Sequence, residues 1–157
     1  MRHTVSALVE NKSGVLARIA TLFAARGFNI DSLTVGETED PGVSRMTIVV
    51  TGDERILEQV EKQLNKLIDI IKVSEYSGVN HIERDLALIK IKADRANRSE
   101  LLQIAETFKA KVLDVSPESM ILEITGDEEK LQSLLSMIKP FGIKEMVRTG
   151  IIAMARK

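Results

Sequence analysis

The sequence of 157 residues contains no cysteine and no tryptophan, and aromatic residues make up only 3% of it. The absence of cysteine excludes a disulfide framework, a thiolate site and any cysteine-based metal site. Because so few side chains are aromatic, the core must be aliphatic, and a hydrophobic content of 44% is sufficient to build one. A chain of this length can form one domain or two small ones.

No charge of either sign dominates, since 22 basic residues accompany 23 acidic ones. Such a balance argues against nucleic acid or an anionic membrane as a general partner. No apolar run approaches the length of about 18 residues that a membrane span needs, and the first residues, MRHTVSALVE, are not typical of a secretory leader. We therefore expect a cytoplasmic protein.

Only two histidines are present, His3 and His81, and they lie far apart in the sequence. A metal sensor would need clustered ligands of this type. We therefore expect no metal site, and we expect both histidines to be solvated surface residues.

The first half of the chain alternates between strand-like and helix-like hydrophobic patterns. The predicted strands are residues 3–10, 28–36, 43–50 and 68–76. The predicted helices are residues 15–27 and 55–67. The resulting order βαββαβ is that of the ferredoxin-like unit.

The second half nearly repeats this pattern. Its predicted strands are residues 84–93, 111–116, 119–126 and 143–155. Its predicted helices are residues 99–110 and 129–138. The repeat is clearest in TGDERILEQV (51–60) and TGDEEKLQSL (125–134), where Thr-Gly-Asp-Glu predicts a capped helix start. The sequence thus predicts an α+β protein of two tandem ferredoxin-like units, residues 1–78 and 79–157.

The segment ENKSGVLARI (10–19) lies where the first strand is followed by the first helix. A helix N-terminus offers unpaired N–H groups and a partial positive charge, which suit a carboxylate or a phosphate. Gly14 lets the backbone approach a ligand closely, and Asn11 offers both a donor and an acceptor. The alternative is structural, with Asn11 and Ser13 capping the helix and Gly14 relaxing a turn. No nucleotide-binding glycine motif is present.

In a ferredoxin-like unit the second strand, here FNIDSLTVG (28–36), lies at a sheet edge. An exposed apolar edge favours pairing with another chain, and two-fold pairing of like edges would give a closed dimer. Asn29 lies beside this edge, either as part of a ligand site or as a turn residue after Gly27.

The run ENKSGVLARIATLFAARGFNIDSLTVG, followed by SRMTIVV and LEQVEKQLNKLIDIIKV, resembles the small regulatory subunits of acetohydroxyacid synthase (AHAS), also called acetolactate synthase. The resemblance covers nearly the whole chain and is strongest over residues 1–92. Residues 1–78 are similar to ACT domains, which bind amino acids.

This resemblance implies a subunit with no active site and no cofactor of its own. Its partner would be a catalytic subunit that uses thiamine diphosphate, magnesium and FAD. The small subunit would activate that partner and confer feedback inhibition by valine on branched-chain amino-acid biosynthesis. The resemblance also implies a homodimer through the ACT domain, with valine bound between two chains. The corresponding residues are Asn11, Gly14, Val15 and Leu16 from one chain and Asn29 and Ile30 from its partner.

Other functions are compatible with the same architecture. A free-standing ACT-domain sensor would bind an amino acid but regulate a different enzyme. The segment Gly14–Arg18 is similar to the phosphate-holding loop of acylphosphatases, although Ala17 stands where that family has an aromatic residue. An RNA-binding domain would need stacking aromatic side chains on its sheet, and Tyr76 is the only tyrosine.

Two expectations concern other surfaces. Arg18 and Arg26 are candidates for contact with the catalytic subunit, because they lie on an exposed helix. The segment ADRANRSE (93–100) occupies the position of the first loop in the second half but has no glycine. We therefore expect no equivalent ligand site there.

Overall fold

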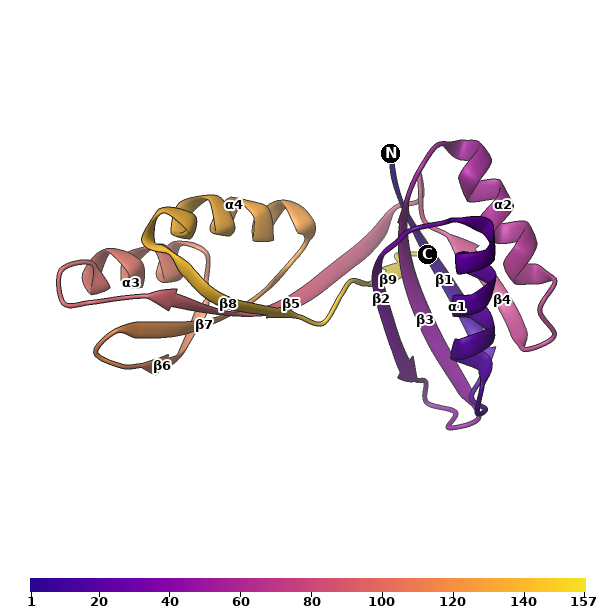
Figure 1. Cartoon of the computed structure of the whole chain (residues 1–157), viewed down its shortest axis with the longest axis horizontal. Helices are drawn as coiled ribbons and strands as arrows, with labels where there is room; N and C mark the ends of the chain where they lie inside the picture. Colours follow the sequence, from indigo (N-terminus) through magenta and orange to yellow (C-terminus); the bar gives the residue numbers. More distant parts are fainter. The chain divides into compact units, whose positions relative to one another are not determined.

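The computed structural model describes all residues, 1–157, which form two compact units. The first unit contains Met1–Ile82 together with Ile151–Lys157, and the second contains Glu83–Gly150. The chain enters the second unit along one long strand and returns to the first unit shortly before its end (Figure 1). No helix is long and apolar enough to cross a membrane.

The first unit has the predicted βαββαβ order. Its elements are β1 (Arg2–Glu10), α1 (Val15–Arg26), β2 (Ile30–Glu37), β3 (Val43–Thr51), α2 (Glu54–Asn65) and β4 (Ile70–Glu75). The sheet order β2-β3-β1-β4 confirms that the first strand is central and that the second lies at an edge. Both helices pack on one face of this sheet (Figure 1).

Alternation along the strands places the apolar side chains on the face that the helices cover. Large side chains buried in this first core include Ile19, Phe23, Met46, Ile48 and Leu64. Burial of each stabilises the fold by about 2 kcal/mol. The core is therefore aliphatic apart from Phe23, as the composition predicts.

The second unit repeats the arrangement. Its elements are β5 (His81–Lys92), α3 (Arg98–Thr107), β6 (Lys111–Val115), β7 (Ser119–Gly126), α4 (Glu128–Ile138), a short 3-10 helix (Lys139–Phe141) and β8 (Ile143–Arg148). The sheet order β6-β7-β5-β8 matches that of the first unit, and α3 and α4 cover a core of its own. The predicted fold class, two tandem ferredoxin-like units, is confirmed.

The two Thr-Gly-Asp-Glu segments start helices, as predicted. Asp53 accepts a hydrogen bond from the backbone N of Ile56 at 3.0 Å, and Asp127 accepts one from Lys130 N at 2.9 Å. Each aspartate thus satisfies a backbone donor that the helix leaves unpaired.

The prediction of one closing strand over 143–155 is wrong. The structure has β8 and then β9 (Ile152–Ala155), which pairs with β5. Gly150 interrupts the extended backbone with a φ of +91°. That left-handed conformation cannot continue a β-strand, and only glycine adopts it without strain.

The prediction that His3 is solvated is also wrong. His3 is buried, with Nδ1 2.9 Å from Ser77 Oγ and Nε2 3.1 Å from the Gly52 carbonyl oxygen. His3 has the same parity along β1 as Val5 and the other core residues of that strand, so it faces the covered side of the sheet. His81 is half-buried, and its ring stacks on Tyr76 with centroids 5.2 Å apart.

The helix cap at Asp53 gives a stability prediction for the first unit. Asp53→Ala should lower the free energy of unfolding by about 1 kcal/mol, because Ile56 N loses its acceptor. Asp53→Ser should retain most of the stability. Urea unfolding followed through Tyr76 measures the effect, since this buried residue is the only tyrosine and the chain has no tryptophan. Equal stability of Asp53→Ala and the unmodified chain would contradict the prediction.

Candidate functional site

The loop after β1 leaves the N-terminus of α1 without a side-chain cap. Gly14 occupies the cap position with a φ of +87°, and no side chain accepts a hydrogen bond there. The first turn of α1 has no acidic residue, whereas α2, α3 and α4 each have at least one. The partial positive charge at this helix end is therefore not offset within the helix, which favours binding of an anion.

The structural alternative, in which Asn11 and Ser13 cap α1, is wrong. The Asn11 Nδ2 instead donates to Glu37 Oε1 at 3.2 Å and to the Pro41 carbonyl oxygen at 2.9 Å. Asn11 thereby fastens the loop to the end of β2 and to the turn that follows it. The Asn11 side chain is exposed, and no side chain caps the start of α1.

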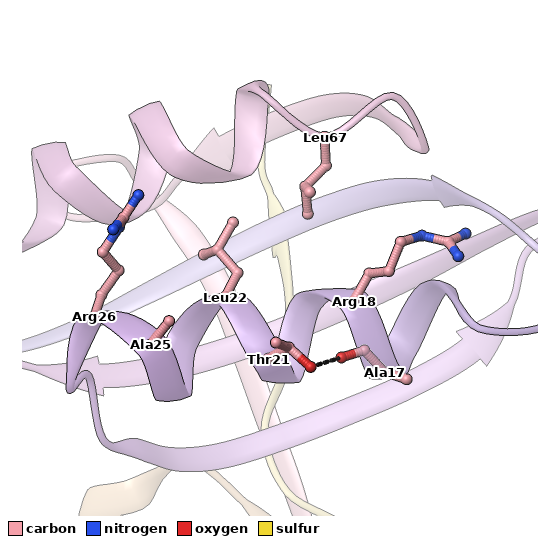
Figure 2. Close-up of a pocket in the computed structure, with 7 residues that line it drawn as sticks. All are labelled: Ala17, Arg18, Thr21, Leu22, Ala25, Arg26 and Leu67. Carbon is pink, nitrogen blue, oxygen red and sulfur yellow. Dashed lines mark hydrogen bonds between the residues drawn. The ribbon is translucent and has the colours of Figure 1, made fainter.

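The guanidinium of Arg18 lies beside Gly14. A Cβ on Gly14 would lie 3.1 Å from Arg18 Nη1, which is closer than an ordinary contact. Arg18 Nε donates to Asp69 Oδ2 at 2.7 Å, and this carboxylate is almost completely buried. Figure 2 shows the Arg18 side chain extending toward the N-terminal end of α1. A cationic group therefore stands next to the uncapped helix end.

Asp69 also connects the loop to the sheet through its backbone. Its carbonyl oxygen accepts a hydrogen bond from Glu10 N at 2.9 Å, at the end of β1. The Arg18–Asp69 ion pair thus holds the first turn of α1 against the strand ends on either side. Arg18 is paired with this carboxylate within the chain. The pairing argues against a role for Arg18 as the phosphate-holding arginine of an acylphosphatase.

The predicted site residues form two groups at opposite ends of the sheet. Ile30 pairs with Val50, which pairs with His3 near the start of β1. Asn11 to Leu16 follow the other end of β1, at Glu10. Strands rise about 3.3 Å per residue, so the two groups in one chain are separated by roughly 20 Å along the strand direction. One chain does not bring them together.

The side chains of these residues differ in exposure. Val15 is 3% exposed and packs in the first core, whereas Leu16 is 47% exposed. Ile30 is half-buried against the core, and Asn29 is exposed with its Nδ2 donating to Asp31 Oδ1 at 2.7 Å. Of the predicted apolar site residues, Leu16 and Ile30 are therefore the ones with side-chain surface exposed.

A groove of about 440 Å³ lies between α1 and the segment that follows α2 (Figure 2). Its lining residues are Ala17, Arg18, Thr21, Leu22, Ala25, Arg26 and Leu67. Arg26 Nη2 donates to Gln63 Oε1 at 2.9 Å beside it. The groove contains none of the predicted ligand-binding residues, but it contains both arginines that were expected at a protein contact.

Comparisons with known proteins address the whole chain. Residues 84–157 match the family model for the small subunit of acetolactate synthase, and residues 5–72 match the AHAS small subunit-like ACT domain. The chain is 53% identical over 157 residues to the acetolactate synthase small subunit of Aquifex aeolicus, covering 99% of this chain and 82% of that protein. The chain belongs to the acetolactate synthase small-subunit family.

Two further relatives support membership of the acetolactate synthase small-subunit family. The probable acetolactate synthase small subunit of Archaeoglobus fulgidus is 53% identical over 156 residues, covering 99% of this chain and 98% of that protein. The crystal structure of the acetolactate synthase small subunit of Thermotoga maritima superposes with a TM-score of 0.90 at 45% identity, covering 100% of this chain and 98% of that one.

In this small-subunit chain, the loop of the second unit that corresponds to Asn11–Leu16 is closed by its own hydrogen bonds. Asp94 Oδ1 accepts from Ala96 N at 2.9 Å and from Asn97 N at 3.0 Å, and Asn97 Oδ1 accepts from Asp94 N at 2.8 Å. The polar side chains there are thus engaged with the local backbone. The expectation of no equivalent ligand site in this loop stays a prediction.

The two ends of α1 give a matched pair of glycine substitutions. Gly14 and Gly27 both have positive φ, but a Cβ on Gly27 would meet nothing within 4 Å. Each change to alanine should cost about 1 kcal/mol of stability from the backbone alone. Gly14→Ala should cost more than Gly27→Ala, because it also displaces Arg18 from Asp69. Urea unfolding measures both losses, and equal losses would contradict the contact between Gly14 and Arg18.

Proposed function

We propose that this chain is the regulatory subunit of a cytoplasmic acetolactate synthase. It has no catalytic activity of its own, it activates a separate catalytic subunit, and it makes that subunit sensitive to valine. Thiamine diphosphate, magnesium and FAD belong to the catalytic subunit. Family membership over the full length supports the general role. One structural observation supports the site: the two groups of predicted ligand-binding residues lie at opposite ends of one sheet.

Two-fold pairing of β2 with its copy would join these groups. The outer edge of β2 is unpaired in the sheet order, so an antiparallel copy can add there. Such pairing would set the start of one β2 beside the end of the other, near Glu37. Asn11 contacts Glu37 within one chain. Asn29 and Ile30 of the partner subunit would therefore lie beside the loop that contains Asn11 and Gly14.

In this dimer, the two domains of the chain would have different roles. Effector binding and dimerisation belong to the ACT domain, residues 1–78. Glu83–Gly150 form a related regulatory domain, rather than the whole of residues 79–157, because Ile151–Lys157 return to the first unit. Because each two-fold dimer repeats the same contact, it would contain two identical effector sites.

The chemistry of each site fits a branched amino acid. The effector carboxylate would bind at the uncapped end of α1, where Gly14 allows close approach of a ligand to the backbone. The amide oxygen of Asn11 and polar groups near Asn29 of the partner subunit would accept from the ammonium group. Leu16 and the partner subunit's Ile30 would contact the branched side chain. Val15 supports this surface from the core.

Regulation follows from thermodynamic linkage. Valine bridges two subunits and favours one arrangement of the dimer, which the catalytic subunit senses. If valine changes the affinity of the chain for the catalytic subunit by some factor, the catalytic subunit must change the affinity for valine by the same factor.

A charge introduced at Gly14 tests the site. Gly14→Asp should weaken valine binding at least about 100-fold, since two carboxylates roughly 4 Å apart repel by about 4 kcal/mol near a protein surface. Calorimetric titration of the purified chain with valine measures the affinity. Gly14→Asn is the matched control, because asparagine brings the same strain at positive φ and the same contact with Arg18 but no charge. Equal affinities of the two variants would contradict the proposed site.

The assignment to acetolactate synthase has its own test. The chain alone should form no acetolactate from pyruvate. Added to its catalytic subunit, it should raise the activity and introduce inhibition by valine. Valine binding by the chain without any effect on the catalytic subunit would indicate a free-standing ACT-domain sensor instead.

A further inference from the structure

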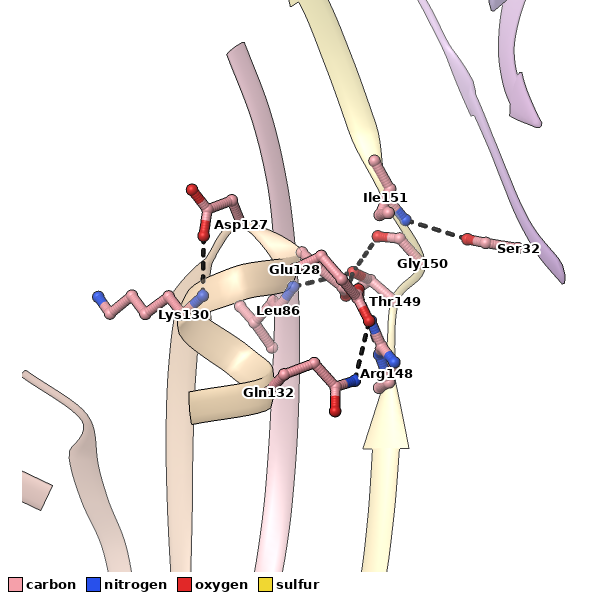
Figure 3. A network of polar contacts seen from close by, with 11 residues as sticks. Ser32, Leu86, Asp127, Glu128, Lys130, Gln132, Arg148, Thr149, Gly150 and Ile151 are labelled. Carbon is pink, nitrogen blue, oxygen red and sulfur yellow. Dashed lines mark hydrogen bonds and ion pairs between the residues drawn. The ribbon is translucent and has the colours of Figure 1, made fainter. Parts of the chain in front are cut away.

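The last strand of the second unit ends in a network that holds Arg148 and Thr149 (Figure 3). Arg148 Nε donates to Asp85 Oδ2 at 3.0 Å, and Arg148 Nη2 donates to Glu128 Oε2 at 2.8 Å. Asp85 is almost completely buried. Burial disfavours the charged guanidinium, but the hydrogen bonds to the two carboxylates outweigh it and raise the pKa of Arg148. Arg148 therefore stays charged and anchored.

Thr149 is fastened to the same unit through β5. Its backbone N donates to the Leu86 carbonyl oxygen at 3.0 Å, and its Oγ1 accepts from Leu86 N at 3.1 Å. The hydroxyl also donates to Asp85 Oδ1 at 3.1 Å. The chain up to Thr149 is thus a fixed part of the second unit.

From Ile151 onward the chain belongs to the first unit, and β9 also pairs with β5. Ile151 is 1% exposed, and its backbone N donates to Ser32 Oγ at 3.2 Å (Figure 3). Further along, Arg156 N donates to the Asn80 carbonyl oxygen at 3.1 Å. Gly150 alone separates the anchor at Thr149 from the anchor at Ile151. One residue spans only about 3.8 Å, so this connection has almost no slack.

Ser32 lies in β2 directly after the proposed effector residues. The β2–β3 ladder shifts register between Ile30 and Ser32, which leaves Asp31 outside the regular pairing. The Asp31 carboxylate accepts from Asn29 Nδ2 at 2.7 Å and from Thr51 Oγ1. Asn29, Asp31 and Ser32 therefore form one short polar segment. A ligand that forms hydrogen bonds with Asn29 competes with the hydrogen bond between Asn29 and Asp31, and so changes the hydrogen bonding of this segment.

We propose that Ser32 is a positioning residue that transmits effector binding to the second unit through its hydrogen bond to Ile151. Occupation of the site at Asn29 and Ile30 shifts the start of β2, and Ser32 shifts the position of Ile151. Because Gly150 is the only intervening residue, the displacement reaches Thr149 and the Arg148 network. This inference rests on the proposed valine site and adds the route by which the site acts.

The test separates valine binding from its consequence. Valine affinity is measured by calorimetry for the chain alone and for the chain in complex with its catalytic subunit. The ratio of the two affinities is the coupling factor. Ser32→Ala should leave the affinity of the chain alone unchanged and reduce the coupling factor about fivefold, the effect of one lost hydrogen bond. Ser32→Thr keeps the hydroxyl and should restore the coupling.

A second variant changes no side chain. Two glycines inserted between Gly150 and Ile151 keep both anchors but add slack, and should reduce the coupling factor like Ser32→Ala. The same insertion after Pro117, in the turn between β6 and β7, is the control. An undiminished coupling factor in Ser32→Ala or in the Gly150 insertion overturns the proposed route. Absence of valine binding by the unmodified chain overturns the proposed function, and the route with it.

Discussion

The central position of β1 in the sheet order β2-β3-β1-β4 determines where the ends of the other strands of the first unit lie. β3 and β4 pair with β1 on its two sides, and α1 and α2 cover its apolar face, so the loop that follows β1 is fixed at one end of the sheet. The same order leaves β2 at the edge, with its start at the opposite end. An effector that needs both segments must therefore bind between two chains. The proposed dimer and the proposed location of the site would thus have the same cause.

Two ion-pair arrangements hold the loop before α1 and the end of β8 in place. Asp69 is buried and holds Arg18 across the uncapped end of α1, so the loop is ordered without an acidic cap. A capping carboxylate there would occupy the position where an anionic ligand would bind. In the second unit, Asp85 and Glu128 hold Arg148 at the point where the chain returns to the first unit. In each case a buried carboxylate fixes an arginine at a junction.

Much of the fold could be predicted from the sequence, because it depends on local patterns. Hydrophobic periodicity located the helices and most strands within three residues, and the two Thr-Gly-Asp-Glu segments identified two helix starts. The break at Gly150 was missed, because a single glycine in an apolar run resembles an ordinary strand residue. The contacts of Asn11 with Glu37 and of Arg18 with Asp69 join residues 26 and 51 positions apart. No local pattern reports such pairs. Among these missed features, only the burial of His3 could have been inferred. His3 lies two residues before Val5 in the same strand, so both side chains point to the same face of the sheet.

Mixed dimers test whether each effector site is built from two chains. One chain would carry Gly14→Asp and the other Asn29→His, with different tags so that the mixed dimer can be isolated. Each variant alone should bind no valine. In the mixed dimer, one site combines both substitutions and the other contains neither. Calorimetry should find one normal valine site per mixed dimer, half the number in the unmodified dimer. Absence of binding in the mixed dimer would place each site within a single chain and exclude a site shared by two chains.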